Sequence, residues 1–100
     1  MTSNPNEPTT PAARLTLRPL AERTNEAIYE LQCELQRARK KFPDNQLMLA
    51  ALMEEVGELA NAIIEGKDWQ AEALQVACVA IRIVTEGDST HGLEVGDGIY

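Results

Sequence analysis

Residues 74–84 leave this chain few ways to fold, because Gln75 and Arg82 are the only polar residues in the run. A helix that is apolar nearly all round must be buried on most of its sides. The chain has 100 residues, which is room for one small domain, and its other helical stretches cannot cover such a helix. We therefore expect an all-α bundle whose core is completed by oligomerisation, as a dimer or a tetramer.

Two further helices are expected before this run. Apolar residues recur every three or four positions over residues 20–41, which predicts a helix that Pro43 terminates. The next helix should begin at a cap provided by Asp44 or Asn45 and stop at Gly66. Its apolar stripe consists of Leu49, Leu52, Met53, Val56, Leu59, Ala60 and Ile63.

The third helix ends the predicted helical domain, which lies between an N-terminal segment and a C-terminal tail. Asp68 is the expected cap at its start and Gly87 the expected stop at its end. Residues 1–19 are rich in Pro, Thr, Ser and Asn, and we expect a flexible N-terminal segment. Residues 20–88 form the predicted helical domain. Residues 89–100 form a C-terminal tail, expected to be loose or docked on a partner.

Composition narrows the classes of partner. The formal net charge of −7 argues against nucleic acid as the main partner. The longest apolar stretch, residues 76–81, is far too short for a membrane span, and no secretory signal pattern opens the chain. Cys33 and Cys78 lack a CxxC spacing or a nearby His, so we expect reduced, structural cysteines. These features together predict a cytoplasmic protein with no membrane or nucleic-acid partner.

Four carboxylates are the candidate chemistry of the chain: Glu54, Glu55 and Glu58 on the second helix, and Glu72 on the third. Like charges three or four residues apart on a helix repel one another unless a cation lies among them, and Mg²⁺ prefers carboxylate oxygens. A hairpin across the turn at Gly66 would bring both acidic stripes to one pocket. An ordinary solvated acidic surface remains the alternative. Glu55 and Glu58 share their stripe with Met48, Ala51 and Ala62.

The spacing of these acids resembles that of the MazG-like, all-α nucleoside triphosphate pyrophosphohydrolases. That family has Glu-Glu-x-x-Glu on one helix and Glu-x-x-Asp on a later one. This chain has Glu54-Glu55-Val56-Gly57-Glu58 and then Glu72-Ala73-Leu74-Gln75. The resemblance, over residues 47–88, implies a MazG-like helical bundle and Mg²⁺-dependent hydrolysis of a (d)NTP to a monophosphate and pyrophosphate, with Mn²⁺ as a substitute cation. Gln75 departs from the family pattern, because an amide oxygen brings no charge to a metal.

The same resemblance implies a role for each acidic position. Glu55, Glu58, Glu72 and the Gln75 position would hold the metal, and Glu54 would assist the attacking water.

Basic residues should meet the outer phosphates, with Arg82 as the first candidate, followed by Lys67 and by Lys41 in the 37–41 cluster. Arg82 has an alternative role in a buried pair with Glu72 or Glu86. The 37–41 cluster has an alternative role as favourable charge at a helix C-terminus. For the chain as a whole, the alternative function is a non-catalytic helical oligomer, or a nucleotide-binding module with a degenerate metal site.

Overall fold

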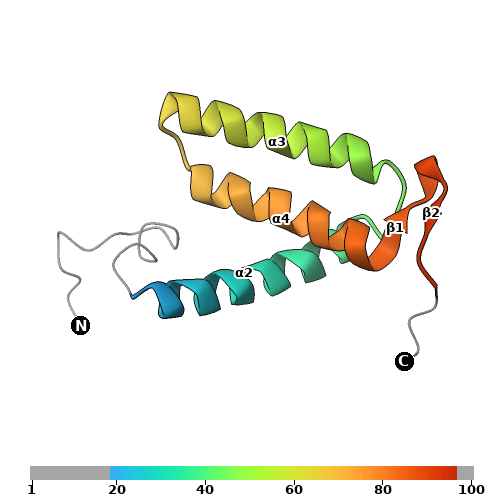
Figure 1. Cartoon of the computed structure of the whole chain (residues 1–100), viewed down its shortest axis with the longest axis horizontal. Helices are drawn as coiled ribbons and strands as arrows, with labels where there is room; N and C mark the ends of the chain where they lie inside the picture. The colour runs from blue at the N-terminus through green and yellow to red at the C-terminus, as the bar shows by residue number, and fades with distance from the viewer. Residues whose placement is uncertain (1–18, 97–100) are drawn as a thin grey trace.

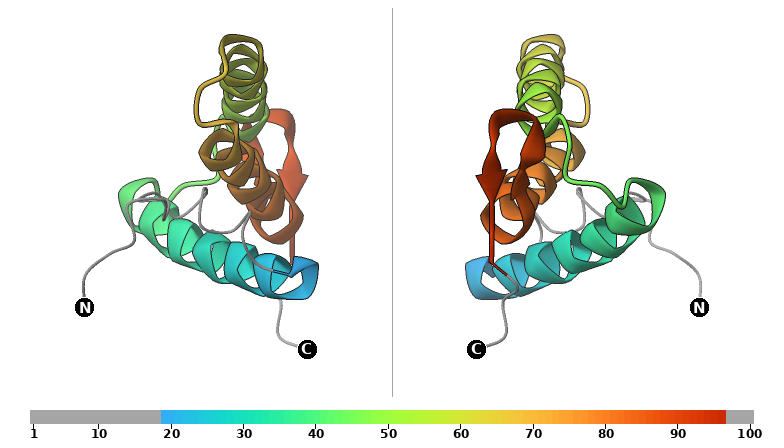
Figure 2. Two further views of the ribbon diagram at one scale, coloured as in Figure 1. Left: turned by 90° about the vertical axis from the view of Figure 1, so that its left-hand side faces the viewer. Right: turned by 90° about the vertical axis from the view of Figure 1, so that its right-hand side faces the viewer.

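The computed structural model describes residues 19–96, which contain three long helices. With the labels of Figure 1, α2 spans Leu20–Lys41, α3 spans Met48–Glu65 and α4 spans Trp69–Glu86. Helix α4 lies between the other two, pairing with α3 along its length, and α2 crosses it obliquely (Figure 2). The predicted all-α architecture is confirmed. The remaining parts of the predicted N-terminal segment and tail lie outside the described residues.

Most helix ends lie where the sequence predicts them. Helix α2 stops at Lys41, just before Phe42 and Pro43. Gly66 ends α3 in the left-handed conformation, with φ of 69°. The Asp68 carboxylate caps α4 by accepting a hydrogen bond from the Ala71 N–H at 3.2 Å. These ends follow from local chemistry, because each stop or cap acts within its own turn.

The start of α3 differs from the prediction, since neither Asp44 nor Asn45 caps it. The helix begins at Met48, after Leu47 in the left-handed conformation with φ of 58° and no side-chain cap. The cap comes from the far end of the described chain. The Asp88 carboxylate accepts a hydrogen bond from the Leu49 N–H at 2.9 Å, and the Thr90 hydroxyl accepts one from the Leu47 N–H at 2.8 Å.

We expected the segment after α4 to be loose or docked on a partner, and its described part, up to residue 96, is not loose. Strands β1 (Gly87–Asp88) and β2 (Leu93–Glu94) pair antiparallel, with the 3-10 helix η1 (Ser89–His91) between them. This segment lies against the start of α3 (Figure 1). The Asn45 side chain donates to the Glu86 carbonyl at 2.7 Å, and the Ser89 N–H donates to the Asn45 carbonyl at 3.1 Å. The segment thus docks on its own chain.

The face of α3 that meets α4 also differs from the expected one. Met48 and Ala62, which share a stripe with the acids, are the buried residues of α3. On the predicted apolar stripe, Met53 is 67% exposed and Ile63 is 59% exposed. Because α3 has apolar residues on two faces, periodicity alone does not reveal which face meets the rest of the chain.

The coverage of α4 is better than its composition led us to expect. Nearly all of its side chains are buried or half-buried between α2 and α3, although Val84 is 71% exposed. The four buried hydrophobic residues of the described chain are Leu35, Met48, Ala62 and Cys78. Within residues 19–96, α3 carries five of the exposed large hydrophobic residues, more than either other helix. No helix within residues 19–96 has the length and apolar character needed to cross a bilayer.

Candidate metal site

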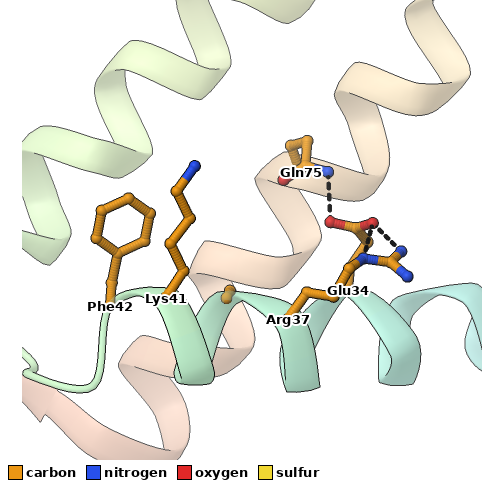
Figure 3. A pocket seen from close by; sticks show the side chains of 6 residues that line it. Glu34, Arg37, Lys41, Phe42 and Gln75 are labelled. Carbon is orange, nitrogen blue, oxygen red and sulfur yellow. Dashed lines mark hydrogen bonds and ion pairs between the residues drawn. The ribbon is translucent and has the colours of Figure 1, made fainter.

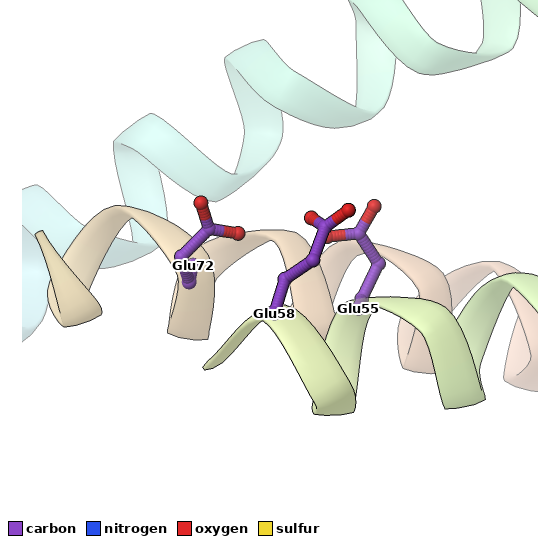
Figure 4. A group of neighbouring side chains, drawn as sticks. All are labelled: Glu55, Glu58 and Glu72. Carbon is purple, nitrogen blue, oxygen red and sulfur yellow. The ribbon is translucent and has the colours of Figure 1, made fainter. Parts of the chain in front are cut away.

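Three carboxylates converge on one side of the α3–α4 hairpin. Glu55 and Glu58 lie one turn apart on α3, and Glu72 lies in the first turn of α4. Their side chains point to the same side (Figure 4), and one oxygen from each lies within 4.8 Å of the other two. The hairpin predicted across the Gly66 turn explains this convergence, since it places the C-terminal half of α3 beside the start of α4.

The environment of Glu55 is unfavourable for a carboxylate alone. Its Oε2 atom is buried and has no hydrogen-bond partner. Burial raises the pKa of Glu55, the charge of Glu58 and a hydrogen bond with it raise it further, and the charges of Glu72 and Glu54 add to the rise. A buried oxygen without a donor, close to like charges, is costly unless a cation or a proton satisfies it. Carboxylate oxygens are the ligands that Mg²⁺ and Mn²⁺ prefer, so this set of side chains fits such a cation.

Two of the three carboxylates, Glu58 and Glu72, line a groove of about 410 Å³, a volume within the size range of small-molecule sites. Lys67 lies at this groove, but its Nζ is 2.8 Å from the Glu65 carboxylate in an exposed ion pair. Glu54, the proposed partner of the attacking water, is exposed and lies outside the group of converging oxygens. The lining residues are Glu58, Asn61, Ala62, Glu65, Lys67, Asp68 and Glu72.

Three polar lining residues were not site candidates from the sequence, although Asp68 was the expected cap of α4: Asn61, Glu65 and Asp68. The sequence does contain a pattern that could have indicated two of them as site residues. Asn61 and Glu65 follow Glu58 at three and seven residues, which places them on the same face of α3.

Gln75 is engaged elsewhere, on the side of α4 that faces α2 (Figure 3). Its amide Nε2 donates a hydrogen bond to the Glu34 carboxylate at 2.9 Å. The same carboxylate accepts from the Arg37 guanidinium. The bond from Gln75, followed by that from Arg37, lowers the pKa of Glu34. Glu34 was not a sequence candidate, because no local pattern indicates which residue of α4 it meets.

Lys41 lies with Gln75 at a second groove, of about 280 Å³, between α2 and α4. The predicted phosphate-binding lysines are thus divided between two grooves, with Lys67 beside Glu58 and Glu72, and Lys41 beside Gln75. The Lys41 ammonium also lies 5.4 Å from the centre of the Phe42 ring.

Arg82 is buried, and its guanidinium is bound within the fold. Its Nε and Nη2 atoms donate to the Glu86 carboxylate at 3.0 and 2.8 Å. Nη2 also donates to the main-chain carbonyls of Phe42 at 2.7 Å and Asp44 at 3.3 Å. Of the two roles left open for Arg82, the structure contains the pair with Glu86. The bonds to the Phe42 and Asp44 carbonyls join α4 to the connection between α2 and α3.

Comparison of the chain with family models, with curated proteins and with solved structures returns no match.

Proposed function

We propose that this chain is a Mg²⁺-dependent nucleoside triphosphate pyrophosphohydrolase that acts as a homo-oligomer. It would cleave a (d)NTP between the α and β phosphates, giving a monophosphate and pyrophosphate, with Mn²⁺ as a substitute cation. The observation that carries the proposal is the convergence of the Glu55, Glu58 and Glu72 oxygens within 4.8 Å of one another. The Glu-Glu-x-x-Glu spacing and its resemblance to MazG-like enzymes support the same conclusion.

Each residue of the proposed site has a stated task. Glu55, Glu58 and Glu72 would hold the cation. When bound, Mg²⁺ neutralises phosphate oxygens and lowers the pKa of a water molecule. Glu54 would accept the proton of the attacking water, and Lys67 would bind an outer phosphate from the edge of the groove. Water adds to the α phosphorus as the bond to the bridging oxygen breaks, and pyrophosphate leaves with that oxygen.

A second candidate function rests on Gln75. Its amide donates to Glu34, so the fourth position of the family motif adds no charge to the metal set. Glu55, Glu58 and Glu72 are then the only charged residues among the proposed metal ligands. One fewer anion among the metal ligands favours an alternative function. The chain would then be a module that binds a nucleotide without cleaving it, or a helical oligomer with a degenerate metal site.

Glu55→Gln tests the proposal without depending on turnover alone. Removing a half-buried carboxylate that repels its neighbours should leave the melting temperature in EDTA equal to that of the wild type or above it. The rise in melting temperature on adding Mg²⁺ should be lost, because binding to the folded state is what produces it. Release of pyrophosphate from a panel of canonical and modified triphosphates should be lost too.

Glu22→Gln is the matched control, because Glu22 is exposed in the first turn of α2. It should keep both the Mg²⁺-dependent stabilisation and the turnover of the wild type. Glu54→Gln separates the two roles, since it should keep metal binding and lose turnover. A wild-type protein that binds Mg²⁺ but releases no pyrophosphate would support the second candidate function. One that does neither would remove the proposal.

A further inference from the structure

One face of α3 is apolar, uncharged and uncovered, and we call it the outer face. Helix α3 lies at the edge of the molecule, with α4 beside it on one side (Figure 1), and the residues of the outer face are all exposed. Its large side chains range from Leu49, 43% exposed, to Ile64, 81% exposed. The face consists of eight exposed residues: Leu49, Ala50, Met53, Val56, Gly57, Ala60, Ile63 and Ile64.

The outer face runs straight along the helix, because its members recur every seven residues. The eight positions are also arranged symmetrically about the point between Val56 and Gly57. For each position before that point, another position of the face lies at the same distance after it. Two antiparallel copies would therefore place large residues opposite small ones along most of the face. The facing pairs are Val56 with Gly57, Met53 with Ala60, Ala50 with Ile63, and Leu49 with Ile64.

We propose that the outer face is the docking surface for a second copy of this chain, with the two α3 helices antiparallel. A two-fold contact needs a surface that is complementary to itself, and the symmetric alternation of large and small residues supplies one. At Gly57, a Cβ atom would meet nothing within 4 Å, so a second backbone has room to approach there. A charged partner would find no ion pair on this face.

The extent of the face is consistent with such a contact. The helix from Leu49 to Ile64 rises about 24 Å. Covering its large side chains would remove on the order of 400 Å² of apolar surface per copy, about half of what each partner buries in a standard interface. The face would form the apolar centre of the contact, and flanking residues would supply the rest. The inference does not rest on the metal site. The buried residues of α3, Met48 and Ala62, lie on the stripe that holds Glu55, and the outer face is a separate stripe.

Val56→Arg tests whether the face is an interface. At micromolar concentration, light scattering should give the wild type at least twice the 11.0 kDa of one chain, and the variant half the wild-type mass. Val84→Arg is the matched control, because Val84 is 71% exposed on α4, and its mass should equal that of the wild type. Far-ultraviolet circular dichroism checks that both variants stay helical. A monomeric wild type, or an unchanged mass for Val56→Arg, would overturn the proposal.

Cysteine pairs test the antiparallel direction. When the Met53→Cys and Ala60→Cys variants are oxidised in separate samples, neither should form an intermolecular disulfide. In an antiparallel pair, the same position in the two chains lies about 10 Å apart along the helix axis. A mixture of the two variants should form the disulfide readily. The wild type, with half-buried Cys33 and buried Cys78, is the control for disulfides of the native cysteines. Disulfides in the separate variants would indicate parallel helices, and none in the mixture would indicate a different contact; either result contradicts the proposal.

Discussion

Replacing Arg82 by Met should destabilise the protein far more than it impairs any chemistry. The substitution keeps an unbranched apolar stem and removes the donors to Glu86 and to the carbonyls of Phe42 and Asp44. Breaking a buried ion pair costs about 3–5 kcal/mol when the remaining charge is left without a partner. Glu86 is 22% exposed and keeps its bond from Arg39 at 2.9 Å, so we expect less, about 2–3 kcal/mol.

For a domain of this size, that loss corresponds to a fall in melting temperature of roughly 10–20 °C. The measurement is thermal unfolding at fixed protein concentration, followed by circular dichroism. Arg39→Met is the control, because it removes the other partner of Glu86 from an exposed position. An exposed pair contributes about 0–1 kcal/mol, so that variant should lose only a few degrees.

The pH dependence gives the pair a second signature. The Arg82 side chain, followed by Arg39, lowers the pKa of Glu86 below its ordinary value. A carboxylate with a lowered pKa in the folded state adds stability above its unfolded pKa, and this stability disappears as the pH falls through the folded pKa. The gap between wild type and Arg82→Met should therefore be full at pH 7 and shrink below about pH 4. If Arg82→Met melts like the wild type but loses pyrophosphate release, this reasoning is refuted, and Arg82 is again the candidate for binding the outer phosphates.

Gly87→Ala should cost about 3 kcal/mol or more by urea unfolding, because φ is 77° with ψ of −159° and a Cβ would lie 2.2 Å from the Leu93 carbonyl oxygen. Gly66→Ala, at a similar φ but with open space around it, should cost only about 1–2 kcal/mol, and equal losses would contradict the account of the close approach. Gln75→Asp should raise the pKa of Glu34, measured by NMR titration, because it replaces the amide donor that chiefly lowers this pKa with a second carboxylate. If Mg²⁺ raises the melting temperature of Gln75→Asp more than that of the wild type, the position belongs to the metal site; equal shifts would place it outside.

The helices and the acid cluster were accessible from local patterns. The stop at Pro43, the caps at Asp68 and Gly66, and the periodicity of the apolar residues each act within one or two turns. The convergence of Glu58 and Glu72 followed from a short turn between two helices, which leaves them little choice but to pair. These features needed no knowledge of which distant residues meet.

The sequence by itself therefore determined three helices, their stops and an acidic hairpin. The tertiary structure alone decided that Asp88 caps α3 and that Gln75 meets Glu34. Of the roles that the sequence left open for Arg82, the structure contains the pair with Glu86, beside the carbonyl of Phe42. It also decided which of the two apolar faces of α3 packs on α4. Each of these contacts except the Arg82–Glu86 pair joins residues about forty positions apart, and a hydrogen bond at that separation depends on how whole helices dock. Local sequence patterns do not predict that docking, because an isolated helix with two apolar faces has no preference for burying one of them. Only the neighbouring helices decide which face is buried.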